Sequence, residues 1–208
     1  MKSNSRSKTL KSNSRSKTLL VMLLSFSLLA TGCSAQWINV ALADLPVLLQ
    51  MALNIGSLVA TVQSGKPLSP TESAEIQDIS NQASRDLNLL QALYNEYKTS
   101  PSATTLQKIR NSFADMNHNL PALLQAAHIS DPVLSTRITA GVNLILSTVN
   151  SFATLIPQPV GPVTAQKVLR KPTAVPHSSD LKKQWNQQVC GPSGNTAVDS
   201  ALSYCELK

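Results

Sequence analysis

Residues that enzymes depend on are scarce in this chain. It has three histidines, His118, His128 and His177, and no Glu-x-x-His pair of the kind that builds a di-iron bundle. Glycine-rich phosphate loops, Cys-x-x-Cys-His haem sites and Gly-x-Ser-x-Gly elbows are also missing from the sequence. Catalysis requires a titratable group that a second group positions. We therefore predict no catalytic residue, no metal site and no cofactor.

The excess of positive charge is confined to the start of the chain. There are 18 basic and 11 acidic residues, a formal net charge of +7. Six of the basic residues and none of the acids lie in residues 2–18, so residues 33–208 carry twelve positive and eleven negative side chains. No basic stripe with interleaved aromatic residues is left to contact phosphates. We predict that nucleic acid is not a partner.

The basic start has the layout of an export signal. It contains the nonapeptide KSNSRSKTL twice, at residues 2–10 and 11–19, and a largely apolar run of eleven residues follows, Leu19–Leu29. As a helix this run would span only about 16 Å of the ~30 Å hydrocarbon core of a bilayer. A basic region, a short apolar run and small residues before a cleavage point are typical of a signal peptide. We predict that this leader directs export.

The sequence Leu-Ala-Thr-Gly-Cys that ends this leader resembles the lipobox of bacterial lipoproteins. The resemblance covers residues 1–34, and it departs from the usual pattern at Ala30, where a larger aliphatic residue is common. It implies that residues 1–32 are removed as a signal peptide, and that Cys33 becomes the lipidated first residue of the mature chain and attaches the protein to a membrane.

The residues after the cysteine bear on location and on the alternative cleavage. Ser34 follows Cys33, which by analogy with enteric bacteria implies the periplasmic face of the outer membrane. Residues 33–35 would then form the anchor segment. The alternative is an ordinary secretory signal that is cut after Ala35, with no lipid attached.

Residues 36–156 show the spacing of amphipathic helices and contain only three glycines. Apolar residues recur at steps of three and four, and strand-like alternation is absent. We predict four helices of about 25 residues, each roughly 37 Å long. The first runs from about Trp37 to Val62, and the second runs to Tyr97 from a capping box formed by Ser69-Pro70 and Glu72. The third covers Leu106–Ala127, and the fourth runs from Asp131-Pro132 to Ile156.

Short links between these segments favour antiparallel neighbours. The predicted fold class is therefore all-α, an antiparallel up-down four-helix bundle over residues 36–156. Pro46 and Pro121 should kink or restart their helices, because proline lacks the N–H of an interior helix bond. We predict that the first helix is the most buried. A membrane or partner contact is its alternative role, although Asp44 would cost about 2.5–3.5 kcal/mol at a bilayer centre.

The tail differs in composition from the bundle. Residues 157–177 contain five prolines and should form an extended linker. Residues 178–208 show two short helical patterns, from Ser179-Asp180 and over Thr196–Tyr204. If Cys33 carries lipid, Cys190 and Cys205 remain, and an oxidising compartment favours a disulfide between them, which would hold these segments together as a small helical hairpin. The alternative is two free thiols.

These patterns predict a lipid-anchored, non-catalytic helical domain of the cell envelope that acts through contacts with an envelope protein. One alternative is a binding module for an apolar ligand or lipid held between the helices. A second alternative is a membrane-active exclusion or lysis factor that uses the first helix. The sequence contains no residue pattern that decides among these three functions.

Overall fold

Four long helices make up most of the described chain: α2 (Gln36–Val62), α3 (Pro70–Thr99), α4 (Ala103–Ala126) and α5 (Pro132–Leu155). Two short helices follow, α6 (Ser178–Gln188) and α7 (Thr196–Leu202). The computed structural model describes residues 36–62, 68–156, 175–194, 196–202 and 205–208, and this part of the chain contains no β-strand. The predicted all-α fold is confirmed. Residues 37–208 belong to one compact unit.

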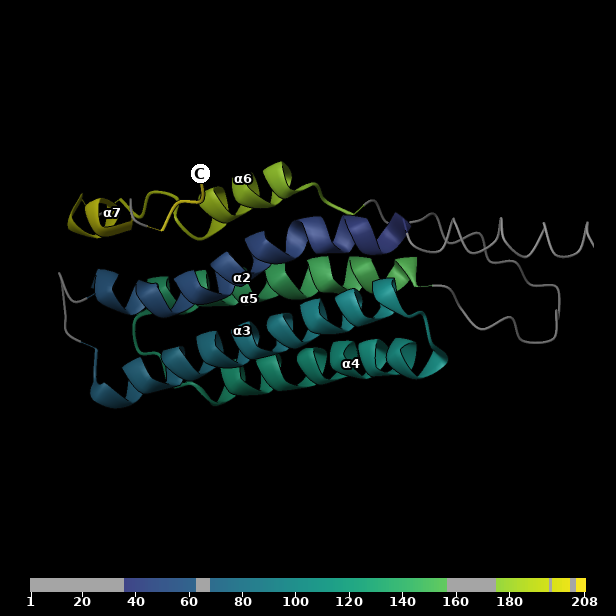
Figure 1. Cartoon of the computed structure of the whole chain (residues 1–208). Helices are drawn as coiled ribbons and strands as arrows, with labels where there is room; N and C mark the ends of the chain where they lie inside the picture. Colours follow the sequence, from purple (N-terminus) through teal and green to yellow (C-terminus); the bar gives the residue numbers. More distant parts are fainter. Residues whose placement is uncertain (1–35, 63–67, 157–174, 195, 203–204) are drawn as a thin grey trace, which may run out of the picture. The chain divides into compact units, whose positions relative to one another are not determined.

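The long helices lie side by side as a bundle (Figure 1). Contacts at two levels show that α2 and α3 run antiparallel. The hydroxyl of Ser80 donates to the carbonyl of Ala52 at 2.7 Å. Further along, the ring centroids of Trp37 and Tyr94 lie 5.6 Å apart. From the first contact to the second, the residue number falls along α2 and rises along α3. The two helices therefore run in opposite directions.

The first turn of α3 also connects α3 to the end of α4. The predicted capping box is present, with Ser69 and Glu72 bonded to each other's backbone N–H groups. The second carboxylate oxygen of Glu72 accepts from the backbone N–H of Ser130, at 2.8 Å. Glu75 accepts in the same way from the backbone N–H of His128, at 2.8 Å. The loop after α4 is therefore held against the start of α3, so α3 and α4 are antiparallel.

Neither internal proline ends a helix. Pro46 lies within α2 and Pro121 within α4, and both helices continue through them. Of the predicted kink or restart, the structure therefore excludes the restart. The predicted apolar faces do point inward, and the largest side chains with almost no exposed surface include Leu45, Leu48, Ile55, Ile76, Ile79, Leu87, Tyr94 and Phe152.

The most buried long helix is α5 rather than α2, contrary to the prediction. Both helices are long and apolar enough to cross a membrane by length and composition alone. Within the bundle, 56% of the apolar window of α5 is buried, against 44% for that of α2. The reason is that α4 and α6 both pack against α5, whereas one side of α2 stays open. A core helix of a soluble protein passes the same length test, so these two helices are weak evidence for a span.

The contacts of Glu72 make the fold sensitive to acid. Hydrogen bonds from Ser130 and then from Ser69 lower the pKa of Glu72 to about 2, from 4.5. Because the folded-state pKa is the lower one, this contribution to stability is complete above about pH 4.5 and is lost as the pH falls toward about 2. We expect Glu72→Gln to flatten the fall in the free energy of unfolding over that range, measured by urea titration at several pH values. Asp78→Asn, an exposed change on the same helix, is the control, and an equal flattening there would contradict the assignment.

Candidate interaction surface

The C-terminal hairpin, residues 178–208, is closed by the predicted disulfide between Cys190 and Cys205. Asp199 supports the turn between them, since its carboxylate accepts from both the backbone N–H and the hydroxyl of Ser193, each at 2.6 Å. Asn186 bonds the backbone of Leu207 in both directions, at 2.8 and 3.0 Å. The hairpin therefore has its own internal framework in addition to the disulfide.

Trp185 of α6 seats this hairpin on the bundle. Its side chain is fully buried, and it lies against Gly141 of α5, where a Cβ would come within 3.0 Å of the indole ring. The indole N–H donates to the carbonyl of Cys205 at 3.0 Å, and the amide of Asn54 on α2 donates to the same carbonyl at 3.0 Å. A single backbone oxygen thus joins α6, α2 and the disulfide segment.

A charged side chain from the bundle lies at each end of α6. Asp44 of α2 is 4% exposed and faces the backbone N–H of Ser178 at the start of α6. Burial raises the pKa of Asp44, and His177 together with that N–H opposes the rise. Arg137 of α5 donates to the carbonyls of Val189 and Gly191 beyond the last turn of α6. Each charge is opposite in sign to the partial charge of the helix dipole at its end of α6, so the two charges favour this one docked position.

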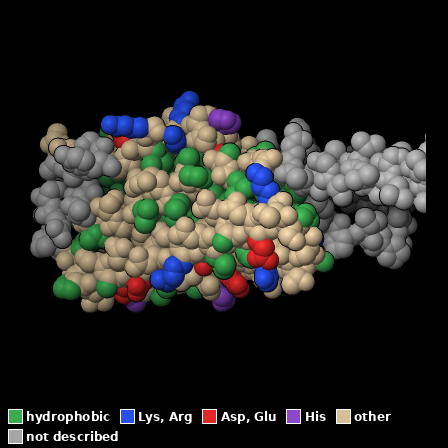
Figure 2. All heavy atoms as spheres, viewed as in Figure 1, with side chains coloured by type: hydrophobic (Ala, Val, Ile, Leu, Met, Phe, Trp, Pro, Cys, Tyr) green, Lys and Arg blue, Asp and Glu red, His purple; other side chains and the backbone are tan. Residues whose placement is uncertain are grey.

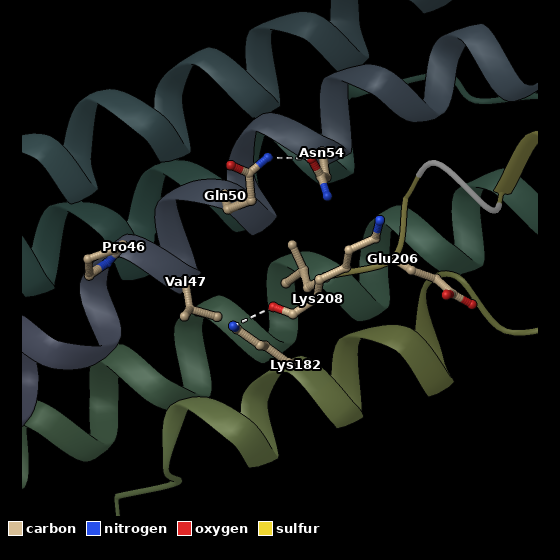
Figure 3. Close-up of a pocket in the computed structure, with 8 residues that line it drawn as sticks. Pro46, Val47, Gln50, Asn54, Lys182, Glu206 and Lys208 are labelled. Atoms are coloured by element: carbon tan, nitrogen blue, oxygen red, sulfur yellow. Dashed lines mark hydrogen bonds between the residues drawn. The ribbon is translucent and has the colours of Figure 1, made fainter.

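A groove lies where the hairpin meets α2 (Figure 3). Its volume is about 400 Å³, and α2 contributes Val47, Gln50 and Asn54. The hairpin side carries Lys182 and Glu206, and the ammonium of Lys182 is bonded to the backbone oxygen of Lys208 at 2.5 Å. Charged and amide groups therefore line much of this groove. A second surface groove of about 480 Å³ lies at the other end of α6, beside Arg137.

The part of α2 that remains open carries no charge. Its exposed or half-buried residues between α3 and the hairpin follow each other at helical spacing: Leu42, Pro46, Leu49, Gln50, Leu53 and Ser57. Leu53 is 51% exposed, which is high for a large apolar side chain in the middle of a helix. The only charged residue of α2, Asp44, points to α6 instead.

The adjoining edge of α3 is a stripe of amides. Gln77, Asn81, Ser84, Asn88, Gln91 and Asn95 recur at steps of four and three, all exposed or half-buried. A Cβ added at Gly56 of α2 would lie 3.0 Å from the side-chain oxygen of Gln77. This close approach places the stripe beside α2. We call the open side of α2 and this stripe together the neutral face.

Charged side chains surround the neutral face. On α3 the exposed charges Asp78, Arg85 and Glu96 lie away from the stripe, while Lys98 lies just past its end. Figure 2 shows blue and red side chains toward the margins and one end of this view, with green and tan side chains filling the middle. Because charged residues are depleted at the centre of protein interfaces, this is the best candidate interaction surface on the described part of the chain.

The predicted site residues have different outcomes. The disulfide of Cys190 and Cys205 is confirmed. The lipid-attachment residue Cys33 and residues 157–174 of the predicted linker lie outside the described residues. Helix α6 begins at Ser178, one residue before the predicted start, because His177 accepts from the backbone N–H of Ser179 as its cap.

The remaining histidines lie at the surface. His118 is exposed, and His128 has a ring nitrogen 3.9 Å from Glu75 with 90% of its side chain exposed. Across the described ranges, no group of three or more His, Cys, Asp or Glu side chains could hold a metal ion.

The sequence contained a signal for the neutral face that the helix predictions did not use. The amides of α3 share a period of three and four with the apolar residues, but they are displaced around the helix from the buried side. The stripe can be seen in the sequence alone when the uncharged polar residues of this helix are placed around the helix axis at 100° per residue. Its position beside α2 depends on packing and could not be read in this way.

Comparison of the chain with protein-family models, with curated protein sequences and with solved structures finds no match.

Seating of the hairpin can be tested at Gly141. We expect Gly141→Leu to displace Trp185 and to lower the free energy of unfolding by about 1–3 kcal/mol, since the added side chain has no space. In a Trp37→Phe background, which leaves Trp185 as the only tryptophan, its fluorescence should shift to the red. Asn143→Leu on the exposed side of α5 is the matched control. An unshifted spectrum for Gly141→Leu would show that the contact does not hold the hairpin.

Proposed function

We propose that this protein is a lipid-anchored, non-catalytic helical domain of the cell envelope that acts through protein–protein contacts. The observation that carries the contact role is the neutral face, an uncharged strip of α2 and α3 with Leu53 exposed in it. Large exposed apolar side chains within an uncharged surface are typical of binding sites rather than of solvated helix faces.

The leader supports the membrane attachment. Cys33, the proposed site of lipid attachment, precedes Trp37 at the start of the bundle by only four residues, which span at most about 14 Å when extended. The anchor would therefore hold the bundle close to the lipid surface. The disulfide agrees with an oxidising compartment outside the cytosol, the periplasm being our proposal.

A membrane-active role is the second candidate, since α2 and α5 both have the length and composition of a span. The one charged side chain of α2, Asp44, faces the start of α6. The one charged side chain of α5, Arg137, donates to backbone carbonyls beyond the end of α6. Insertion would have to undock the hairpin and carry the charged α3–α4 pair across the bilayer. That cost favours the contact role. An apolar-ligand site has less support, because the groove beside α2 is lined by Lys182, Glu206 and amides.

The anchor can be tested by intact-mass measurement of protein extracted from cells. We expect the chain to begin at Cys33 and to carry added acyl mass, and Cys33→Ser to lack that mass. A chain that begins at Gln36, or a bare cysteine at its first position, would show the alternative cleavage and overturn the lipid attachment.

The contact role can be tested by photocrosslinking in cells. A photoreactive residue at Leu53, on the neutral face, should give a crosslinked protein adduct on a denaturing gel. The same residue at Ala114, which is exposed on α4 outside the face, should give none. Equal labelling at both positions, or no protein adduct at Leu53, would count against the neutral face as a contact surface.

A further inference from the structure

We propose that the disulfide of the C-terminal hairpin and the buried position of Trp185 form one redox-sensitive switch. In the oxidised chain the hairpin is docked on α2 and α5, and a thiol that reduces the disulfide releases it. The bundle of long helices stays folded in both states. The switch is independent of the proposed contact function, because it involves no residue of the neutral face.

The disulfide fixes the acceptor on which docking depends. The carbonyl oxygen of Cys205 accepts from the indole N–H of Trp185 and from the amide of Asn54, each at 3.0 Å. Cys190 lies just beyond the end of α6, and its backbone N–H donates to the carbonyl of Trp185. The S–S bond therefore ties the end of α6 to the segment that supplies the acceptor.

Other bonds between α6 and this segment are open to water. Asn186 pairs with the backbone of Leu207, and Lys182 donates to the backbone oxygen of Lys208 (Figure 3). All four of these residues are half-buried or exposed, so water competes for their hydrogen bonds.

The covalent bond adds a large advantage to the closed hairpin. The two cysteines are 15 residues apart in sequence, and a disulfide across a loop of that size favours the closed form by roughly a hundredfold. Reduction removes this factor.

Release of the segment also removes Trp185 from its position on the bundle. Trp185 and Asn54 are both buried, and each donates to the oxygen of Cys205. A buried donor that loses its acceptor is costly, and both groups regain hydrogen bonds when the hairpin opens to water. We therefore expect the ring of Trp185 to leave its place beside Gly141 of α5 when the disulfide is reduced.

The docked hairpin in turn protects the disulfide. Cys190 and Cys205 are 6% and 3% exposed. Thiol–disulfide exchange requires a thiolate to reach one of the two sulfur atoms. Reduction must therefore start from molecules in which the hairpin has opened. Because the disulfide favours docking and docking shields the disulfide, opening and reduction occur together.

The bundle can outlast this change. Most of the buried apolar side chains in the described part of the chain lie on α2 to α5. The hairpin adds Leu181, Trp185, Val189, Leu202 and the two cysteines. Its opening removes one covering element from α2 and α5 and leaves the packing among the four long helices in place.

Dithiothreitol is a suitable probe, because it completes the exchange without a further reactant. One of its thiolates attacks a sulfur of the protein and forms a mixed disulfide, and its second thiolate closes the reagent into a cyclic disulfide. The reagent is oxidised, and Cys190 and Cys205 receive two electrons and two protons as free thiols.

Fluorescence of the full-length chain in the Trp37→Phe background tests the first half of the switch. We expect dithiothreitol to shift the emission of Trp185 to the red, while circular dichroism retains most of the helical signal. The double variant Cys190→Ser, Cys205→Ser should show the red-shifted spectrum without reductant. The same double variant treated with dithiothreitol is the control for other effects of the reagent, and it should not change further.

The rate of reduction tests the second half. Mass spectrometry after quenching with a maleimide counts the thiols that dithiothreitol releases. We expect Gly141→Leu, which displaces Trp185, to speed their release roughly tenfold or more, because the hairpin is open more often. Asn143→Leu, on the exposed side of α5, should leave the rate unchanged.

Three results would overturn the switch. The first is a reduced chain whose Trp185 emission is unshifted. The second is loss of the long helices together with the hairpin, which would show that the disulfide supports the whole fold. The third is an equal rate of reduction in Gly141→Leu and Asn143→Leu.

Discussion

One backbone carbonyl, that of Cys205, joins the C-terminal hairpin to the bundle. It accepts N–H groups from Trp185 within the hairpin and from Asn54 on α2, and all three groups are buried. An orphaned donor or acceptor at this depth would cost about 1–3 kcal/mol, so each of the three groups depends on the others. Through this contact the hairpin occupies the side of α2 next to α5. That leaves the side next to α3 as the part of α2 that stays open, and it is the side that forms the neutral face.

The elements of the fold that the sequence predicted are those whose causes are local. The capping box of Ser69 and Glu72 and the cap at Asp131 involve residues three positions apart, so their spacing alone identifies them. The apolar faces follow from a period that any buried helix side must have. The disulfide was predicted because, once Cys33 is assigned to lipid by the lipobox resemblance, two cysteines remain and both lie in a short tail.

The features that the sequence did not predict depend on residues far apart in the chain. Glu72 meets Ser130 across 58 residues, and Arg137 meets Val189 across 52. No local pattern marks such a pair, because either residue alone looks like a solvated charge on a helix. The greater burial of α5 over α2 has the same origin. It depends on where α6 lands, which is fixed by the lack of a side chain at Gly141 rather than by the hydrophobicity of α5.

The two kinds of charged residue in the bundle have different tasks. Asp44 and Arg137 are buried and orient α6. The exposed charges lie on α4, on the hairpin and on α3 outside the amide stripe, where they keep the molecule solvated. The neutral face lies between these groups, and it contains only amides, hydroxyls and aliphatic side chains. Ions screen interactions between exposed charges over a Debye length of about 8 Å at 0.15 M salt, but they have little effect on amide hydrogen bonds or apolar burial. A surface built in this way would associate with similar strength in dilute and in concentrated salt.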